Sequence, residues 1–330
     1  MKILAYGVRD DERPYFEVWQ KDHSDVTLSL TPAILNSQTV NEATGCDGIS
    51  VLQTDPIDDK IFDRLSRENV RNVSSRIVGT DAMDLKTAKR LAIKLTNVPA
   101  YSPAAIAEFT VSQLMQLLRH TRRFEAKIRQ QDFRWAPDVS QELNQQTVGV
   151  IGTGRIGRAA IQIYRGFGAK IVAYDVYHDA ELEKQGVYVD SLADLYKAST
   201  VITLHAPATD DDFHMLDAAA FSQMNDGVWI VNAGRGTLIN SQALIEALDS
   251  GKVAGAALDT YEKELPIFNH DLRDQKIADP IFNNLLAREN VLMTPHIAFY
   301  TNVAVKNMVR VSLDHNLSLI QTGTSEDRVI

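Results

Sequence analysis

The chain has 330 residues, which is more than a single hydrophobic core comfortably serves, so we expect two domains. Hydrophobic residues make up 45% of the chain and charged residues 23%, as in ordinary globular proteins. A formal net charge of −9 argues against nucleic acid or an anionic membrane as a partner. Cys46 is the only cysteine, which excludes an intramolecular disulfide and favours the reducing cytoplasm as the compartment.

The first hundred residues alternate short apolar runs with polar, helix-like segments. This alternation predicts a parallel sheet covered by helices. The apolar runs are 3–6, 26–30, 49–52, 73–75 and 93–95. The start of the chain turns from apolar to charged residues within eight positions, so we do not expect a signal peptide there.

A helix is predicted to begin after this first series. Ser102 is typical of an N-cap, and Pro103 is typical of the first helical position. The apolar spacing that follows predicts one long helix, ending near residue 130. Such a helix packs against its own domain and also offers a surface to a second subunit, so we expect a homodimer.

Residues 147–175 contain a dinucleotide-binding pattern in its full context. Gly152, Gly154 and Gly157 follow one apolar run and open a helix-like segment, and a second apolar run ends at Asp175. The glycines allow a tight turn, close approach to a pyrophosphate and close packing of the helix on the strand, while the helix N-terminus offers N–H groups. The carboxylate of Asp175 can bind the ribose hydroxyls of NAD and repels a 2′-phosphate. The sequence therefore predicts NAD as cofactor.

Five further apolar runs and a final helix complete the predicted architecture. The runs are 170–174, 201–204, 228–231, 254–258 and 291–293, and the helix lies within 300–330. The predicted fold class is α/β, with two doubly wound parallel sheets. A Rossmann NAD-binding domain, 101–299, is inserted in a flavodoxin-like substrate domain made of 1–100 and 300–330. Substrate is expected between the two domains.

Polar residues that follow neighbouring parallel strands meet at one edge of the sheet, where ligands bind. Reduction of a keto acid by NADH needs a proton donor and a cation for the substrate carboxylate. His296 with Glu264 supplies the first, and Arg235 supplies the second. No group of His, Cys, Asp and Glu has ligand spacing, so no metal is predicted.

Six motifs carry a resemblance to a known family. They are 97–108, 147–160, 202–209, 231–240, 256–264 and 291–301. Over essentially its whole length the chain resembles the D-isomer-specific 2-hydroxyacid dehydrogenases, and within them the D-lactate dehydrogenase branch. The resemblance implies an enzyme that reduces pyruvate to the D-2-hydroxy acid, and it leaves larger 2-keto acids open as further substrates.

The resemblance also implies roles for individual residues. Arg235 would bind the substrate carboxylate, His296 would be the acid/base and Glu264 its partner. The substrate site would further include Leu52, Val78, Gly79, Tyr101 and Phe299. The cofactor site would include Gly152, Gly154, Arg155, Ile156, Gly157, Asp175, His205, Ala206, Pro207, Asp212, Ala233, Gly234, Arg235 and Asp259.

Two departures from the family pattern keep alternatives open. Asp212 stands where relatives commonly have Asn, and its charge is expected to weaken NAD binding slightly. Leu52 stands where lactate-specific relatives commonly have Tyr, which leaves a preference for bulky branched or aromatic 2-keto acids, the D-hydroxyisocaproate type, as an alternative. A third interpretation is an NAD-sensing protein of the corepressor type.

Overall fold

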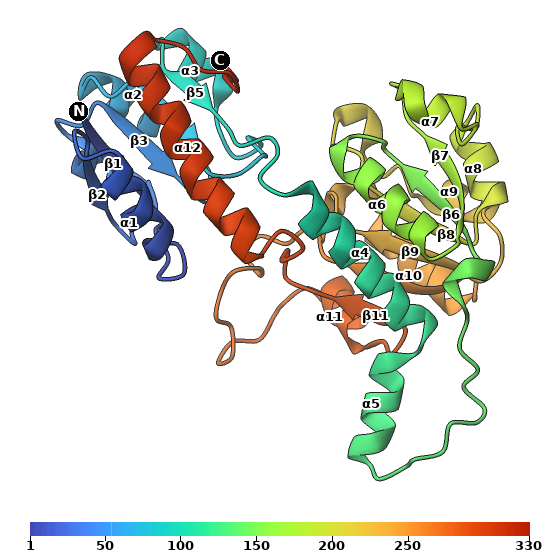
Figure 1. Ribbon diagram of the computed structural model, residues 1–330. Coiled ribbons are helices and arrows are strands. Elements are labelled where there is room, and N and C mark those ends of the chain that lie inside the picture. Colours follow the sequence, from blue (N-terminus) through green and yellow to red (C-terminus); the bar gives the residue numbers. More distant parts are fainter. Residues whose placement is uncertain (54) are drawn as a thin grey trace. The chain divides into compact units, whose positions relative to one another are not determined.

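The computed structural model describes residues 1–53 and 55–330. The chain forms two compact units, which are described separately. Unit 1 comprises Met1–Ser102 and Tyr300–Ile330, and unit 2 comprises Pro103–Phe299. Each unit is built on one parallel sheet with helices packed against it, which confirms the predicted α/β class (Figure 1).

The sheet of unit 1 has the strand order β2-β1-β3-β4-β5, and all its pairs are parallel. The strands are β1 (Lys2–Ala5), β2 (Thr27–Leu30), β3 (Gly48–Val51), β4 (Asn72–Ser75) and β5 (Lys94–Thr96). Each of the five predicted apolar runs forms one of these strands. The order is that of flavodoxin-like sheets.

Helices cover both faces of this sheet. The helical elements are α1 (Arg13–Asp22), η1 (Val40–Ala43), α2 (Asp59–Arg67), α3 (Leu85–Arg90) and α12 (Asn302–Thr322). On one face α1 and α12 lie side by side, and Phe16 and Leu313 share a buried cluster with Ile3 of β1 (Figure 1). The other helices cover the opposite face. Asn316 of α12 donates to the carbonyl of Ile49 at 2.8 Å, so the C-terminal helix is fastened to the N-terminal sheet.

The sheet of unit 2 has the order β11-β10-β9-β8-β6-β7. Its strands are β6 (Thr147–Ile151), β7 (Lys170–Tyr174), β8 (Val201–Leu204), β9 (Val228–Asn232), β10 (Val253–Leu258) and β11 (Val291–Met293), and all six were predicted. Beyond β7, a single parallel bridge joins Ala173 to Tyr188. This bridge takes the place of the third strand of a Rossmann sheet, so the strand order otherwise follows that fold.

Two helical layers enclose this sheet. One layer contains α4 (Pro103–Leu118), α6 (Arg155–Gly166) and α7 (Ala180–Lys184). The other contains α8 (Leu192–Ala198), α9 (Ala218–Gln223), α10 (Ser241–Asp249) and α11 (Pro280–Ala287). Successive residues of a strand point to opposite helical layers. Val150 packs with α4 and α6, and Ile151 packs with the opposite layer.

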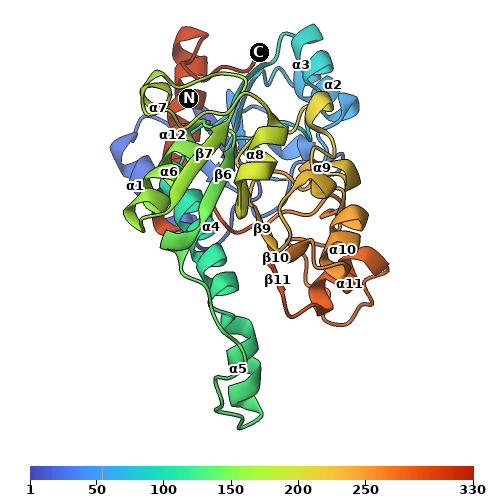
Figure 2. The same cartoon turned by 90° about the vertical axis from the view of Figure 1, so that its right-hand side faces the viewer.

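The prediction of one long helix to residue 130 is wrong. The helix ends at Leu118, and a second helix, α5 (Thr121–Arg129), follows. The break lies at His120, whose φ of 50° is left-handed, and the carbonyl of Leu118 accepts a hydrogen bond from the N–H of Gln141 instead of continuing the helix. Helix α5 has no buried residue and extends away from the rest of unit 2 (Figures 1 and 2).

Throughout the described part of the chain, no helix combines the length and the apolar character needed to cross a membrane.

Candidate active site and cofactor site

The glycine motif forms a tight turn at the point where the strand order of unit 2 reverses. Gly152 follows β6 with a φ of 90°, which favours glycine. A Cβ atom there would lie 2.7 Å from the amide nitrogen of Ala206, which follows the neighbouring strand β8. The ends of β6 and β8 therefore approach each other closely at the switch point of the sheet, where nucleotides bind in this fold.

The N-terminus of α6 fits a pyrophosphate. Gly154 is its N-cap and provides no side-chain cap, and a Cβ atom at Gly154 would meet nothing within 4 Å. A Cβ atom at Gly157 would lie 2.0 Å from the carbonyl oxygen of Gly152, so that position needs glycine for packing. The first N–H groups of a helix, here those that include Arg155 and Ile156, have no acceptor within the helix, and the space beside Gly154 is open.

Asp175 is held in place at the end of β7. Its carboxylate accepts hydrogen bonds from the N–H of Thr153 at 2.5 Å and from the Thr153 hydroxyl at 3.1 Å. The N–H of Tyr177 donates to the other oxygen at 2.9 Å. Thr153 also lies 2.7 Å from the Tyr188 hydroxyl. Sequence reasoning missed Thr153 and Tyr188, although Thr153 lies inside the glycine motif.

The residues after β8 border the same turn. His205 lies beside the turn, where its Cβ atom would be 3.6 Å from a Cβ atom at Gly157. Its Nε2 lies 3.0 Å from the Thr203 hydroxyl, and its Nδ1 is buried without a partner in the described chain. Burial lowers the pKa of His205 to about 4, so the ring is neutral near pH 7. Ala206 and Pro207 continue this edge.

Asp212 lies in a short helical turn, η3 (Asp210–Asp212). Its carboxylate accepts a hydrogen bond from the Thr209 hydroxyl at 2.5 Å. One oxygen of the Asp212 carboxylate is therefore already hydrogen-bonded to a residue of its own loop.

His296 and Glu264 form a hydrogen-bonded pair. His296 Nδ1 lies 2.9 Å from Glu264 Oε1, and the other oxygen of Glu264 accepts from the N–H of Tyr261 at 3.2 Å. The histidine side chain is 36% exposed, and its Nε2 has no partner among the described residues. A carboxylate on Nδ1 orients the ring and leaves Nε2 for proton transfer.

The loop that carries His296 is fixed by Asp259. His296 has a left-handed φ of 56°, a strained conformation for a residue other than glycine. The buried carboxylate of Asp259 accepts from the Thr294 hydroxyl at 2.6 Å and from the N–H groups of Ile297 and Ala298 at 2.9 and 2.8 Å. Asp259 was expected to line the cofactor site, and these contacts give its carboxylate a positioning role.

Arg235 follows β9, the strand next to β10. The Asn232 side chain shapes its loop, since it donates to the Arg235 carbonyl at 2.9 Å and accepts from the N–H of Gly234 at 3.0 Å. Arg235 Nη1 donates to the Gly234 carbonyl at 3.1 Å. Ala233 lies between these residues, at the end of the strand.

The loops of Arg235 and Glu264 are in direct contact. A Cβ atom at Gly236 would lie 2.1 Å from the carbonyl carbon of Tyr261 and 2.4 Å from the amide nitrogen of Glu262. β9, β10 and β11 are neighbours, so Arg235, Glu264 and His296 all follow the carboxyl ends of adjacent parallel strands.

A second histidine–carboxylate pair supports these loops. It was not identified from the sequence. His214 Nε2 lies 2.8 Å from Glu262 Oε2, and the other oxygen of Glu262 accepts from the N–H of Ser241 at 3.2 Å. Asn240 Nδ2 lies 3.2 Å from His214 Nδ1. The spacing of these residues along the chain gives no signal for such a pair.

The expected substrate residues of unit 1 follow β3 and β4. Leu52 is half-buried directly after β3. Val78 and Gly79 lie in the loop after β4, and their N–H groups have no partner within the part of the chain that the structure describes. The Tyr101 carbonyl accepts from Asn307 of α12 at 2.7 Å. Phe299 is the last residue of unit 2.

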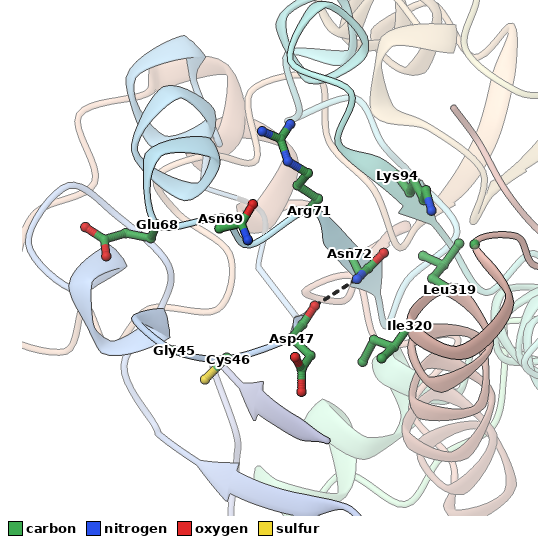
Figure 3. A pocket seen from close by; sticks show the side chains of 11 residues that line it. Gly45, Cys46, Asp47, Glu68, Asn69, Arg71, Asn72, Lys94, Leu319 and Ile320 are labelled. Atoms are coloured by element: carbon green, nitrogen blue, oxygen red, sulfur yellow. Dashed lines mark hydrogen bonds between the residues drawn. The ribbon is translucent and has the colours of Figure 1, made fainter.

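A cavity of about 490 Å³ in unit 1 lies elsewhere. It is at the amino ends of β3, β4 and β5, where the side chain of Asn72 donates to the Asp47 carbonyl at 2.8 Å (Figure 3). Arg71, Lys94, Asp47 and Glu68 give its wall charges of both signs. None of the predicted site residues lines this cavity.

Comparisons with known proteins identify the family to which the chain belongs. The family model of the D-isomer specific 2-hydroxyacid dehydrogenase, NAD binding domain, matches residues 111–298. The chain is 57% identical over 329 residues to a D-lactate dehydrogenase of Lactiplantibacillus plantarum, covering 100% of this chain and 99% of the relative.

Two solved structures share the fold over the whole chain. A D-lactate dehydrogenase from Treponema pallidum superposes with a TM-score of 0.92 at 39% identity, covering 100% of both chains. A D-2-hydroxyisocaproate dehydrogenase superposes with a TM-score of 0.91 at 42% identity, covering 100% of this chain and 99% of the other. The chain therefore belongs to the D-isomer-specific 2-hydroxyacid dehydrogenase family, whose members are NAD-dependent oxidoreductases.

Proposed function

We propose that this enzyme is a D-lactate dehydrogenase, which reduces pyruvate to D-lactate with NADH. The observation that carries the proposal is the pair of His296 and Glu264, with 2.9 Å between Nδ1 and Oε1, on strand ends next to that of Arg235. The 57% identity to a full-length D-lactate dehydrogenase supports pyruvate as the substrate.

The cofactor is proposed to lie along the carboxyl edge of the sheet in unit 2. The turn at Gly152, Gly154 and Gly157, together with the N–H groups of Arg155 and Ile156, would hold the pyrophosphate. Asp175 would bind the ribose hydroxyls. The remaining contacts would come from His205, Ala206, Pro207, Asp212, Ala233, Gly234, Arg235 and Asp259. When bound, NADH supplies the hydride that reduces the keto carbon.

The protein's own groups bind the substrate and supply the proton. His296 donates a proton from Nε2 to the carbonyl oxygen, while Glu264 keeps the ring oriented through Nδ1. Arg235 binds the substrate carboxylate, since a guanidinium can bind both oxygens at once. The free N–H groups of Val78 and Gly79 suit the same carboxylate. We propose that Leu52, Tyr101 and Phe299 contact the rest of the substrate, which makes unit 1 the substrate domain.

The test is to follow the loss of NADH with a panel of 2-keto acids and to determine the chirality of the product. We expect efficient turnover of pyruvate and a D product. An L product would overturn the proposal. The absence of turnover of every 2-keto acid by the folded protein would also overturn it and would favour an NAD-sensing role.

Leu52 supports a second candidate, in which bulky branched or aromatic 2-keto acids are preferred. An aliphatic side chain leaves more room than tyrosine, and each buried methylene of a larger substrate contributes about 0.8 kcal/mol. The structural match to a D-2-hydroxyisocaproate dehydrogenase is in line with this candidate. If Leu52 lines the site, Leu52→Tyr should shift the preference towards pyruvate, and an unchanged ratio of kcat/KM values would remove Leu52 from the site.

We also propose a homodimer that works in the cytoplasm. The support for a dimer is the apolar surface on α5 and the segment after it, where Trp135 is 80% exposed and Val139 is 86% exposed. The support for the cytoplasm is the cysteine content, because Cys46 is the only cysteine and is buried.

A further inference from the structure

Unit 1 contains two opposite charges that are completely buried. Arg76 and Glu12 both have 0% exposed side chains, and Arg76 Nε lies 3.1 Å from Glu12 Oε1. The proposed chemistry uses neither residue. Arg76 directly precedes the loop of Val78 and Gly79, and Glu12 precedes α1.

Arg76 connects the carboxyl ends of three strands. Its Nη2 donates to the carbonyls of Tyr6 and Gly7, just after β1, at 2.8 and 3.2 Å. Its Nη1 donates to the carbonyl and the hydroxyl of Ser50, in β3, at 3.3 and 3.2 Å. Its own N–H donates to the Val51 carbonyl at 2.8 Å. With Arg76 itself following β4, one guanidinium joins β1, β3 and β4 where their loops begin.

Glu12 extends this connection towards the surface. Its second oxygen accepts from the N–H of Arg9 at 3.0 Å and lies 3.8 Å from Arg9 Nη1. Arg9 in turn makes two hydrogen bonds to Asp11, at 3.0 and 2.9 Å, and its guanidinium lies 5.4 Å from the ring centroid of Tyr300. Tyr300 is the residue at which the chain re-enters unit 1.

A buried ion pair is a poor source of stability, because removing both charges from water offsets most of their attraction. What a fully hydrogen-bonded pair provides is a single geometry, since every alternative arrangement leaves a buried charge unpaired. This pair lies at the carboxyl edge of the sheet, where Leu52, Val78 and Gly79 follow the connected strands.

We propose that Glu12 and Arg76 are positioning residues for the 2-keto acid. By fixing the ends of β1, β3 and β4, they hold the free N–H groups of Val78 and Gly79 in the orientation that receives the substrate carboxylate. This inference rests on the proposed function, because it takes these N–H groups as substrate contacts.

The test compares Glu12→Gln and Arg76→Lys with a matched control. Glu12→Gln keeps the volume and removes the charge, whereas Arg76→Lys keeps the charge and removes the planar fork that reaches β1 and β3. The control is Asn316→Ala, because Asn316 is also fully buried in unit 1 but binds the carbonyls of Ile49 and Asn72, away from the carboxyl ends of the strands.

We expect both test variants to raise KM for pyruvate at least tenfold, with kcat within threefold and the Kd of NADH within twofold of the parent. Amide hydrogen exchange at residues 77–79 should become faster in both. Asn316→Ala should lower the melting temperature and leave KM unchanged. If Glu12→Gln does not fold, Arg76→Lys decides the question.

Parental KM values in the folded variants would overturn the inference, as would an equal rise of KM in Asn316→Ala. An Arg235→Gln variant separates this failure from failure of the proposed function. If Arg235→Gln keeps the parental KM for pyruvate, the proposed site is wrong. If it loses pyruvate binding while Glu12→Gln and Arg76→Lys do not, only the positioning role is wrong.

Discussion

Two histidines follow strands of unit 2, and their surroundings give them different chemistry. His296 is partly exposed and pairs with Glu264, whereas His205 is half-buried beside the glycine turn, with a buried Nδ1 that has no partner among the described residues. Desolvation lowers the pKa of His205, which disfavours this ring as a proton donor near neutral pH. The difference between the two residues is therefore made by their neighbours.

We predict that Glu264→Gln lowers kcat/KM for pyruvate reduction. Glutamine is similar in size, but it removes the negative charge that lies 2.9 Å from Nδ1 of His296 and orients the ring. The value of kcat/KM should fall by about tenfold to a hundredfold, which is part of the roughly 10²–10⁴-fold that a positioned general acid contributes. The measurement is kcat/KM for pyruvate reduction in the parent and the variant, and a parental value in the folded variant would mean that Glu264 is not needed to orient the ring.

His205 gives a prediction about acid stability. Its pKa in the folded protein is lowered to about 4 by burial, so between pH ~6.5 and ~4 the unfolded chain binds a proton that the folded chain does not. The free energy of unfolding should therefore fall as the pH decreases through this window. His205→Gln should reduce that dependence when urea unfolding is compared at pH 7 and pH 4.5. The same change at the exposed His178 serves as control, and an equal effect there would contradict the prediction.

Asp175 should determine the choice between NADH and NADPH. Its carboxylate is held by Thr153 and Tyr177, so it cannot turn away from a 2′-phosphate. We predict that the parent strongly prefers NADH and that Asp175→Ser reduces the ratio of kcat/KM values for NADH over NADPH by about tenfold or more, which is about 1.4 kcal/mol. Equal efficiency of the two cofactors in the parent would contradict this assignment.

At the scale of elements, the proposed active site depends on how closely two of its loops approach each other. The loop after β9 carries Arg235, the loop after β10 carries Glu264, and Gly236 is the point of contact. A methyl group there meets backbone atoms that cannot rotate away, unlike the end of a flexible side chain. The two loops must separate to accommodate it.

We predict that Gly236→Ala lowers kcat/KM for pyruvate by about a hundredfold, the scale expected when catalytic groups move by about 1 Å. The overpacking should also destabilise the fold by about 1–3 kcal/mol. Gly166→Ala is the control, because a Cβ atom at Gly166 meets nothing within 4 Å. Near-parental activity in Gly236→Ala would show that the loops can shift without disturbing the site.

The elements that the sequence predicted are those with a local signal. The strands of the two sheets lie on short runs that are rich in apolar residues, and the glycine turn has a fixed spacing that its geometry requires. The break at His120 has no such signal, since neither glycine nor proline interrupts the apolar spacing there. The bridge at Tyr188 was missed because a single bridging residue leaves no periodic pattern in the sequence.

Long-range polar pairs were also beyond sequence reasoning. Glu12 and Arg76 are 64 positions apart, and His214 and Glu262 are 48 apart. Each residue alone is typical of an exposed position, so only the folded arrangement reveals the pair. Arg235, Glu264 and His296 were identified because each follows a strand and the chemistry of NADH requires those residue types.

At the scale of the whole molecule, α5 and the segment after it lack a buried side. No residue of α5 is buried, yet Ile128 of this helix and Phe133, Trp135 and Val139 beyond it are exposed apolar side chains. Figures 1 and 2 both show α5 extending from the rest of unit 2. A cluster of exposed apolar side chains on a projecting segment is typical of a surface covered by a partner.

We predict that this surface forms the proposed homodimer. Replacing Phe133 and Trp135 together by alanine removes two large aromatic anchors, the residue type that contributes most to interfaces, and should shift the protein towards the monomer. The measurement is sedimentation equilibrium over a range of concentrations. Val18→Ala is the control, since Val18 is a similarly exposed apolar residue of unit 1. A parent protein that sediments at 36.7 kDa at every concentration would refute the dimer. A parent dimer that the double variant leaves intact would place the interface elsewhere.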